Sequence, residues 1–80
     1  MLDKKTYLAM KREIKCVCRK NLKELCEIME FDDFEKELLF KFYDGDTVQK
    51  ICMDLCISTM TYNRYMHKII AKIYNYKNTH

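Results

Sequence analysis

The segment FYDGDTVQKICMDLCISTMTYNR, residues 42–64, decides the fold because it contains the clearest helix boundaries of the chain. Gly45, the single glycine, can adopt the left-handed backbone that ends a helix. Thr47 can then cap a short helix, in which apolar residues recur at the helical spacing: Val48, Ile51, Cys52 and Leu55. Ser58 is a suitable cap for the next helix. The segment therefore predicts two helices joined by a short turn.

The helix after Ser58 is predicted to run to about Tyr74 or slightly beyond. One of its sides is apolar and is expected to be buried, with Tyr62, Tyr65, Met66, Ile69 and Ile73. The opposite side is polar and basic, with Met60, Arg64, His67 and Ala71. This helix is thus expected to present a cationic outer face while it forms part of the core.

The first part of the chain, residues 3–30, contains nothing that breaks a helix. Its apolar residues recur mostly at spacings of three and four: Leu8, Ile14, Cys18, Leu22, Leu25 and Met29. This pattern predicts one long amphipathic helix over residues 3–30. Asp32 or Asp33 can cap a further helix that runs to about Tyr43.

The composition favours one all-α domain over residues 1–80. The 80 residues include 49% hydrophobic residues, one glycine and no proline, which favours long helices over short strands joined by tight turns. We expect four helices: the long N-terminal helix packs on a three-helix unit that contains a helix-turn-helix at residues 33–75. No apolar run approaches the roughly 20 residues that a membrane span requires.

The five cysteines are an odd number, and four of them fall where a helical pattern calls for an apolar residue. A secreted framework of disulfides is therefore not expected, and reduced thiols in a cytoplasmic protein fit the pattern. Cys52 and Cys56 together with His67 lack a second closely spaced pair of ligands, so no metal is expected. Without a glycine-rich loop or a nucleophile motif, the sequence predicts neither an enzyme nor a bound cofactor.

The net charge of +3 is unevenly distributed. Residues 1–23 hold eight Lys or Arg against two Asp or Glu, and residues 55–80 hold four basic residues and no acidic one. Residues 24–54 reverse this, with three basic and ten acidic residues. Both ends of the chain could therefore face a polyanion. Solvated helix faces account equally well for the N-terminal run.

Residues 34–73 resemble region four of bacterial RNA polymerase sigma factors and the sigma-like helix-turn-helix proteins of phages and mobile elements. The resemblance covers about half of the chain, and its matching residues are Phe40, Gly45, Thr47, Ile51, Leu55, Ile57, Ser58, Thr61, Tyr62 and Arg64. Two residues depart from the family pattern. Cys52 replaces the usual Ala, and Cys56 replaces the usual Gly of the turn. A non-glycine residue with positive φ costs on the order of 1–2 kcal/mol, so a strained or wider turn is expected.

The resemblance implies a DNA-binding transcriptional regulator whose helix from Ser58 enters the major groove as a recognition helix. The residues that it places on the recognition surface are Thr59, Met60, Thr61, Asn63, Arg64, His67 and Lys68. Arg64 can fork onto guanine, Asn63 onto adenine, and Met60 can contact a thymine methyl group. The remaining polar side chains suit phosphates, namely Thr59, His67 and Lys68. Nothing resembles the parts of a sigma factor that melt a promoter, so a stand-alone regulator is implied, with RNA polymerase or a second copy as a further partner.

Two other functions are compatible with the sequence. In the first, the same fold binds a host protein, such as RNA polymerase or a defence nuclease, through an acidic surface with exposed Phe40 and Tyr43. In the second, the basic N-terminal helix lies on an anionic membrane, although it has no Trp and carries scattered glutamates. Binding of duplex DNA, which weakens steeply with salt, separates the leading hypothesis from a largely apolar protein interface.

Overall fold

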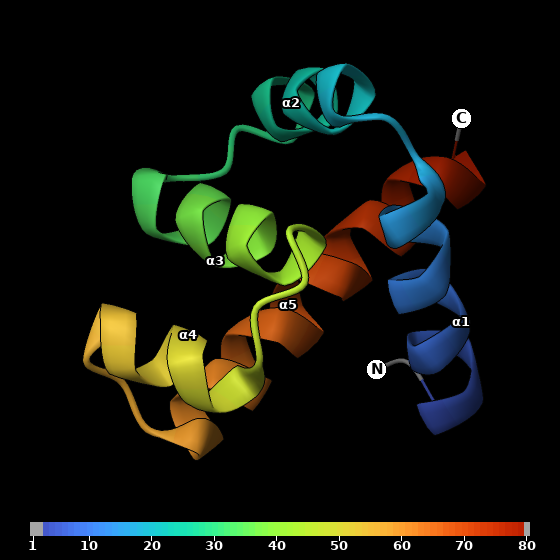
Figure 1. Ribbon diagram of the computed structural model, residues 1–80. Helices are drawn as coiled ribbons and strands as arrows, with labels where there is room; N and C mark the ends of the chain where they lie inside the picture. The colour runs from blue at the N-terminus through green and yellow to red at the C-terminus, as the bar shows by residue number, and fades with distance from the viewer. Residues whose placement is uncertain (1–2, 80) are drawn as a thin grey trace.

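The computed structural model describes residues 3–79, and this part of the chain is all-helical, with five helices and no strand. The helices are α1 (Lys4–Cys16), α2 (Arg19–Ile28), α3 (Asp33–Tyr43), α4 (Val48–Leu55) and α5 (Thr59–Thr79). Figure 1 shows α5 as the long helix on which α1, α3 and α4 pack, with α4 at its N-terminal end and α1 across its C-terminal half. No helix within the described range is long and apolar enough to cross a membrane.

The prediction of one long helix over residues 3–30, and with it the four-helix arrangement, is wrong. The backbone is extended at Val17 and Cys18, which separates α1 from α2. Cys18 caps α2 without a side-chain hydrogen bond. The break is instead held from outside, because the Tyr43 hydroxyl donates a 2.6 Å hydrogen bond to the carbonyl oxygen of Val17. The chain therefore turns here because of a contact with α3, and the separate α2 lies over α3 in Figure 1.

The aromatic residues at the end of α3 are covered by α2 and by the break before it. The Arg19 guanidinium lies 5.1 Å from the centre of the Phe40 ring and forms a 2.6 Å ion pair with Asp44. Phe40 and Tyr43 are both only half-exposed and pack against the core. The exposed aromatic surface that was expected to favour a host-protein partner is therefore not present at these residues.

The predicted helix boundaries of the C-terminal half are confirmed. Asp32, Thr47 and Ser58 each accept a hydrogen bond from the backbone N–H three residues later, at 2.8, 3.2 and 3.1 Å. Each bond satisfies one of the backbone donors that the first turn of a helix leaves unpaired. Gly45 follows α3 with φ +92°, in the left-handed region that favours glycine. α5 extends to Thr79, beyond its expected end near Tyr74.

The core is built mainly on α5. The predicted buried side of this helix is confirmed at Tyr62, Met66, Ile69 and Ile73, with Ile70 in addition, whereas Tyr65 is half-buried. Burial raises the pKa of Tyr62 to about 12, so its ring stays neutral at physiological pH. The other helices and the connection between α2 and α3 contribute the remaining buried apolar residues, which are Tyr7, Met10, Ile14, Leu22, Cys26, Phe31, Leu38, Leu39, Phe42, Ile51 and Cys52.

Several residues that were expected in the core lie at the surface. Leu8 and Val48 are 43% and 38% exposed, and Cys18 is exposed. On α1 the buried positions are instead Tyr7 and Met10. Only two of the five cysteines are buried, so the prediction that four of them fill apolar positions is wrong.

The turn between α4 and α5 contains a left-handed non-glycine residue, as its sequence predicted. Cys56 has φ 56° and ψ 45°, and the next backbone N–H, that of Ile57, bonds the carbonyl oxygen of Cys52 at 3.0 Å. This is the hydrogen bond of a helix end that usually has glycine at the position of Cys56.

Replacement of this residue is expected to stabilise the protein. Cys56→Gly should raise the free energy of unfolding by about 1 kcal/mol, because it relieves the left-handed strain at some entropic cost. Urea denaturation followed by circular dichroism measures the change. Cys56→Ala is the matched control, since it removes the thiol and keeps the Cβ. An equal gain for both variants would show that the thiol, not the backbone, limits stability.

Candidate nucleic-acid interface

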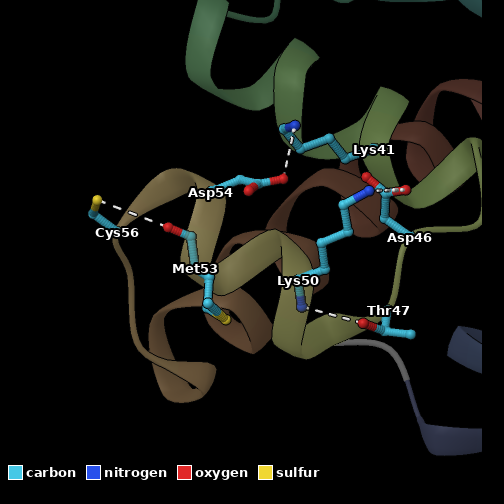
Figure 2. A network of polar contacts seen from close by, with 7 residues as sticks. All are labelled: Lys41, Asp46, Thr47, Lys50, Met53, Asp54 and Cys56. Atoms are coloured by element: carbon cyan, nitrogen blue, oxygen red, sulfur yellow. Dashed lines mark hydrogen bonds and ion pairs between the residues drawn. The ribbon is translucent and has the colours of Figure 1, made fainter.

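α4 and the start of α5 are held in place by side chains on both sides of the turn that precedes α4. The Lys41 ammonium of α3 lies 3.4 Å from Asp54 of α4, and Lys50 lies 3.7 Å from Asp46 (Figure 2). α4 also packs directly on α5, and its residues Ile51 and Cys52 are buried in the core. Asp46 and Asp54 are thus paired with lysines, and these contacts hold the short α4 in its position against α3 and α5.

The seven predicted recognition residues lie in the first ten residues of α5. Six of them are exposed, namely Thr59, Met60, Asn63, Arg64, His67 and Lys68, and Thr61 is half-buried. Helical geometry places Arg64 and Lys68 on the outermost line of α5, opposite the buried side. Thr61 lies on one flank of this line, and Met60, Asn63 and His67 lie on the other.

A hollow of about 340 Å³ occupies the first flank. It is lined by Thr61, Arg64, Tyr65 and Lys68. Tyr65 is fixed by the Phe34 ring of α3, whose centre lies 4.8 Å away at a tilt of 58°. Ser58 donates to the Thr61 hydroxyl oxygen at 3.0 Å, which leaves the Thr61 proton available for another acceptor. Each side chain that lines the hollow can donate a hydrogen bond.

The two cations of this hollow have no acidic partner. Within residues 3–79, neither Arg64 nor Lys68 takes part in an ion pair. Farther along α5, Lys72 lies 3.7 Å from the buried Glu35, and Lys77 pairs with Glu13 of α1. The uncompensated positive charge of α5 is therefore concentrated in its N-terminal half.

The other flank is bordered by α1. The His67 ring stacks on the Tyr7 ring, with centroids 3.9 Å apart and planes 8° apart. One face of the imidazole is therefore covered, and its edge is the part that can reach a ligand. The structure thus places His67 at the boundary of the surface, not at its centre.

A groove of about 630 Å³ lies between α4 and the first residue of α5. Its lining residues are Val48, Gln49, Cys52, Met53, Ile57 and Thr59. Met53 beside this groove and Met60 on α5 are each 72% exposed. Gln49, Met53 and Tyr65 were not among the residues that the sequence predicted for the site. Tyr65 fell within the apolar stripe, and its partial exposure depends on the position of α3.

No group of three His, Cys, Asp or Glu side chains in the described part of the chain is placed to hold a metal ion. Cys52 is buried, whereas Cys56 and His67 are exposed. The thiols and the imidazole that were considered as ligands therefore do not form a site together.

Comparisons with protein-family models, curated proteins and solved structures found no match to this chain. The residues of α4 and α5, their geometry and the pattern of residues 42–64 are therefore the features that indicate a function.

Proposed function

We propose that the protein is a non-enzymatic, cytoplasmic regulator of transcription that binds duplex DNA, with α4 and α5 as its helix-turn-helix and α5 as the recognition helix. The observation that carries this proposal is the hollow on α5 in which Arg64 and Lys68 lie unpaired beside two hydroxyl groups. A polyanion would supply the acceptors that residues 3–79 do not. The major groove is wide enough to admit such a helix.

The hollow suits a phosphate of one DNA strand. Lys68 supplies a positive charge, and the hydroxyl groups of Thr61 and Tyr65 can donate to phosphate oxygens. Such contacts fix the register of a protein on the duplex without reading its sequence. Tyr65 is therefore added to the proposed DNA-binding residues. Thr59 and the edge of the His67 ring are proposed to contact further phosphates.

The opposite flank is proposed to read the bases. When a phosphate occupies the hollow, Asn63 and Met60 face the major groove of the DNA. There the Asn63 amide can fork onto adenine, and Met60 can contact a thymine methyl group. Arg64 lies between the two flanks and has the length to fork onto guanine. A single recognition helix needs a second copy or RNA polymerase to gain useful specificity, so we propose one of these as a further partner.

The role of Tyr65 can be tested by removal of one atom. Tyr65→Phe should weaken duplex binding about three- to ten-fold and equally for all sequences, because one hydrogen bond to a charged group is lost. The Phe ring still packs on Phe34, so the unfolding midpoint should not change. Fluorescence anisotropy with several labelled duplexes measures the affinities. Asn63→Ala is the contrasting variant, since it should change the order of preference among duplexes.

A different result would remove the phosphate assignment. If Tyr65→Phe changed the order of preference among sequences, Tyr65 would contact bases. If Tyr65→Phe left the affinity unchanged while Arg64 variants lowered it, the hollow would lie away from the phosphate backbone of the DNA.

A host-protein partner is the second candidate, and it is now favoured by a different surface. Met53 and Met60 are highly exposed, and Val48 is partly exposed beside the apolar groove between α4 and α5. Exposed methionines are common at adaptable protein-binding surfaces. Binding through this surface would depend little on salt. Met53→Ser should weaken the binding of a protein partner. It should change the affinity for duplex DNA by less than about two-fold, since Met53 lies on α4, away from the hollow lined by Thr61, Arg64, Tyr65 and Lys68.

A further inference from the structure

The outward side of α1 carries an apolar residue among cations. Leu8 is 43% exposed and lies between two hollows of about 230 and 320 Å³. The α1 cationic face consists of the residues that line these hollows, which are Lys5, Leu8, Ala9, Lys11, Arg12 and Lys15 of α1 with Phe42 of α3. None of these residues belongs to α4 or α5.

The cations of this face have no acidic partner. The ammonium groups of Lys11 and Lys15 lie 5.2 and 4.8 Å from the centre of the Phe42 ring. Neither lysine takes part in an ion pair within the described residues, and Glu13, the one acidic residue of α1, pairs with Lys77. Partial burial and the charge of Lys15 lower the pKa of Lys11. A carboxylate beside the two lysines would offset the repulsion between their charges.

We propose that the α1 cationic face binds an acidic amphipathic segment of another protein. An apolar side chain of the partner rests on the exposed Leu8, and flanking carboxylates meet Lys11, Arg12 and Lys15. Charge complementarity identifies the partner as acidic, and the exposed Leu8 identifies it as partly apolar.

Two other polyanions fit this face less well. A phosphate backbone would bring polar groups over the exposed Leu8 and would gain nothing from it. A membrane needs a broad apolar stripe on the helix that lies on it. The apolar stripe of α1 is Tyr7, Met10 and Ile14, and these residues are already buried in the core. A protein segment is the partner that uses both the charges and Leu8.

A peptide selection tests the proposal. The full chain is immobilised and panned with a phage library of random peptides of about a dozen residues, with excess duplex DNA present to occupy any nucleic-acid surface. The enriched peptides are expected to combine Asp or Glu residues with a leucine or an aromatic residue. Their affinities are then measured by fluorescence anisotropy with synthetic copies.

Variants show whether the peptides use this face. Leu8→Ser should weaken the selected peptides about ten-fold, in line with the loss of one buried apolar side chain. Lys11→Gln with Arg12→Gln should weaken them at least as much. The matched control is Lys20→Gln with Lys23→Gln on α2, which removes two exposed lysines elsewhere and should leave binding unchanged.

Three results would overturn the proposal: no enriched peptide, enriched peptides without acidic residues, or equal affinity for wild type and Leu8→Ser. Lipid vesicles of about 30% phosphatidylserine and labelled duplex DNA are measured on the same variants. If Leu8→Ser and the Lys11 and Arg12 variant weakened only vesicle or DNA binding, the face would belong to that partner instead. Because the α1 cationic face lies outside α5, the peptide measurements test this proposal whether or not α5 binds DNA.

Discussion

The double variant Arg64→Ala with Lys68→Ala is expected to weaken the binding of duplex DNA about 100-fold. Contacts of Arg and Lys to bases and phosphates are each worth about 1–3 kcal/mol, and these two cations lie at the centre of the proposed interface. Both side chains are exposed and make no ion pair among residues 3–79, so the fold should not depend on them. Fluorescence anisotropy measures the loss, and circular dichroism checks the helix content.

The salt dependence of the same variant gives a second, independent readout. The slope of the logarithm of the affinity against the logarithm of the salt concentration should become shallower by about 0.9 for each lost phosphate contact. The matched control is Lys20→Ala with Lys23→Ala, which removes the same charge from α2. If this control lost as much affinity as the α5 variant, the effect would be one of net charge, and the assignment of α5 as the recognition helix would fail.

Ile69→Ala is expected to destabilise the protein strongly and to lower its unfolding temperature. The side chain is fully buried at the centre of α5, and the cavity left by such a truncation costs about 2–5 kcal/mol. A domain of this size has a total stability of only about 5–10 kcal/mol, and often less. Thermal unfolding followed by circular dichroism measures the effect.

Two further truncations make this prediction specific. Leu8→Ala removes a similar side chain from the exposed side of α1 and should change the free energy of unfolding by less than about 0.5 kcal/mol. Leu55→Ala should lie between the two, because Leu55 is half-buried. A mild effect of Ile69→Ala, or a large effect of Leu8→Ala, would mean that the core is placed incorrectly.

The sequence predicted the C-terminal half of the fold well because its boundaries are encoded locally. Asp32, Thr47 and Ser58 are short side chains that cap the helix that follows each of them, and Gly45 takes the left-handed backbone after α3. Such signals depend only on neighbouring residues.

The break between α1 and α2 could not be predicted in this way. Neither proline nor glycine lies near it, and Cys18 provides no side-chain cap. It is held by the hydrogen bond from Tyr43, which is distant in sequence. The sequence did contain one sign of the break. On a continuous helix, the side that carries Tyr7 and Ile14 would be rotated by about a quarter turn from the side that carries Leu22 and Cys26. A change of phase of this kind indicates a break when both stripes are buried.

For the candidate site, the sequence predicted which helix presents the polar residues but not how they are grouped. The helical period alone placed Arg64 and His67 on the outer side of α5, and the family resemblance added Lys68. Tertiary contacts decide the rest, because Phe34 holds Tyr65 at the hollow and Tyr7 covers one face of His67. Contacts between helices cannot be derived from the spacing within one of them.

The measurement that tests the central claim most directly is an anisotropy titration of the purified protein with labelled duplex DNA at about 50 and 200 mM salt. Two phosphate contacts alone should make binding about ten-fold weaker at the higher concentration, and more contacts should increase this factor. Affinities that also differ among duplex sequences would support α5 as a recognition helix. The absence of binding at the lower salt concentration would contradict the account and leave a protein partner as the function of this surface.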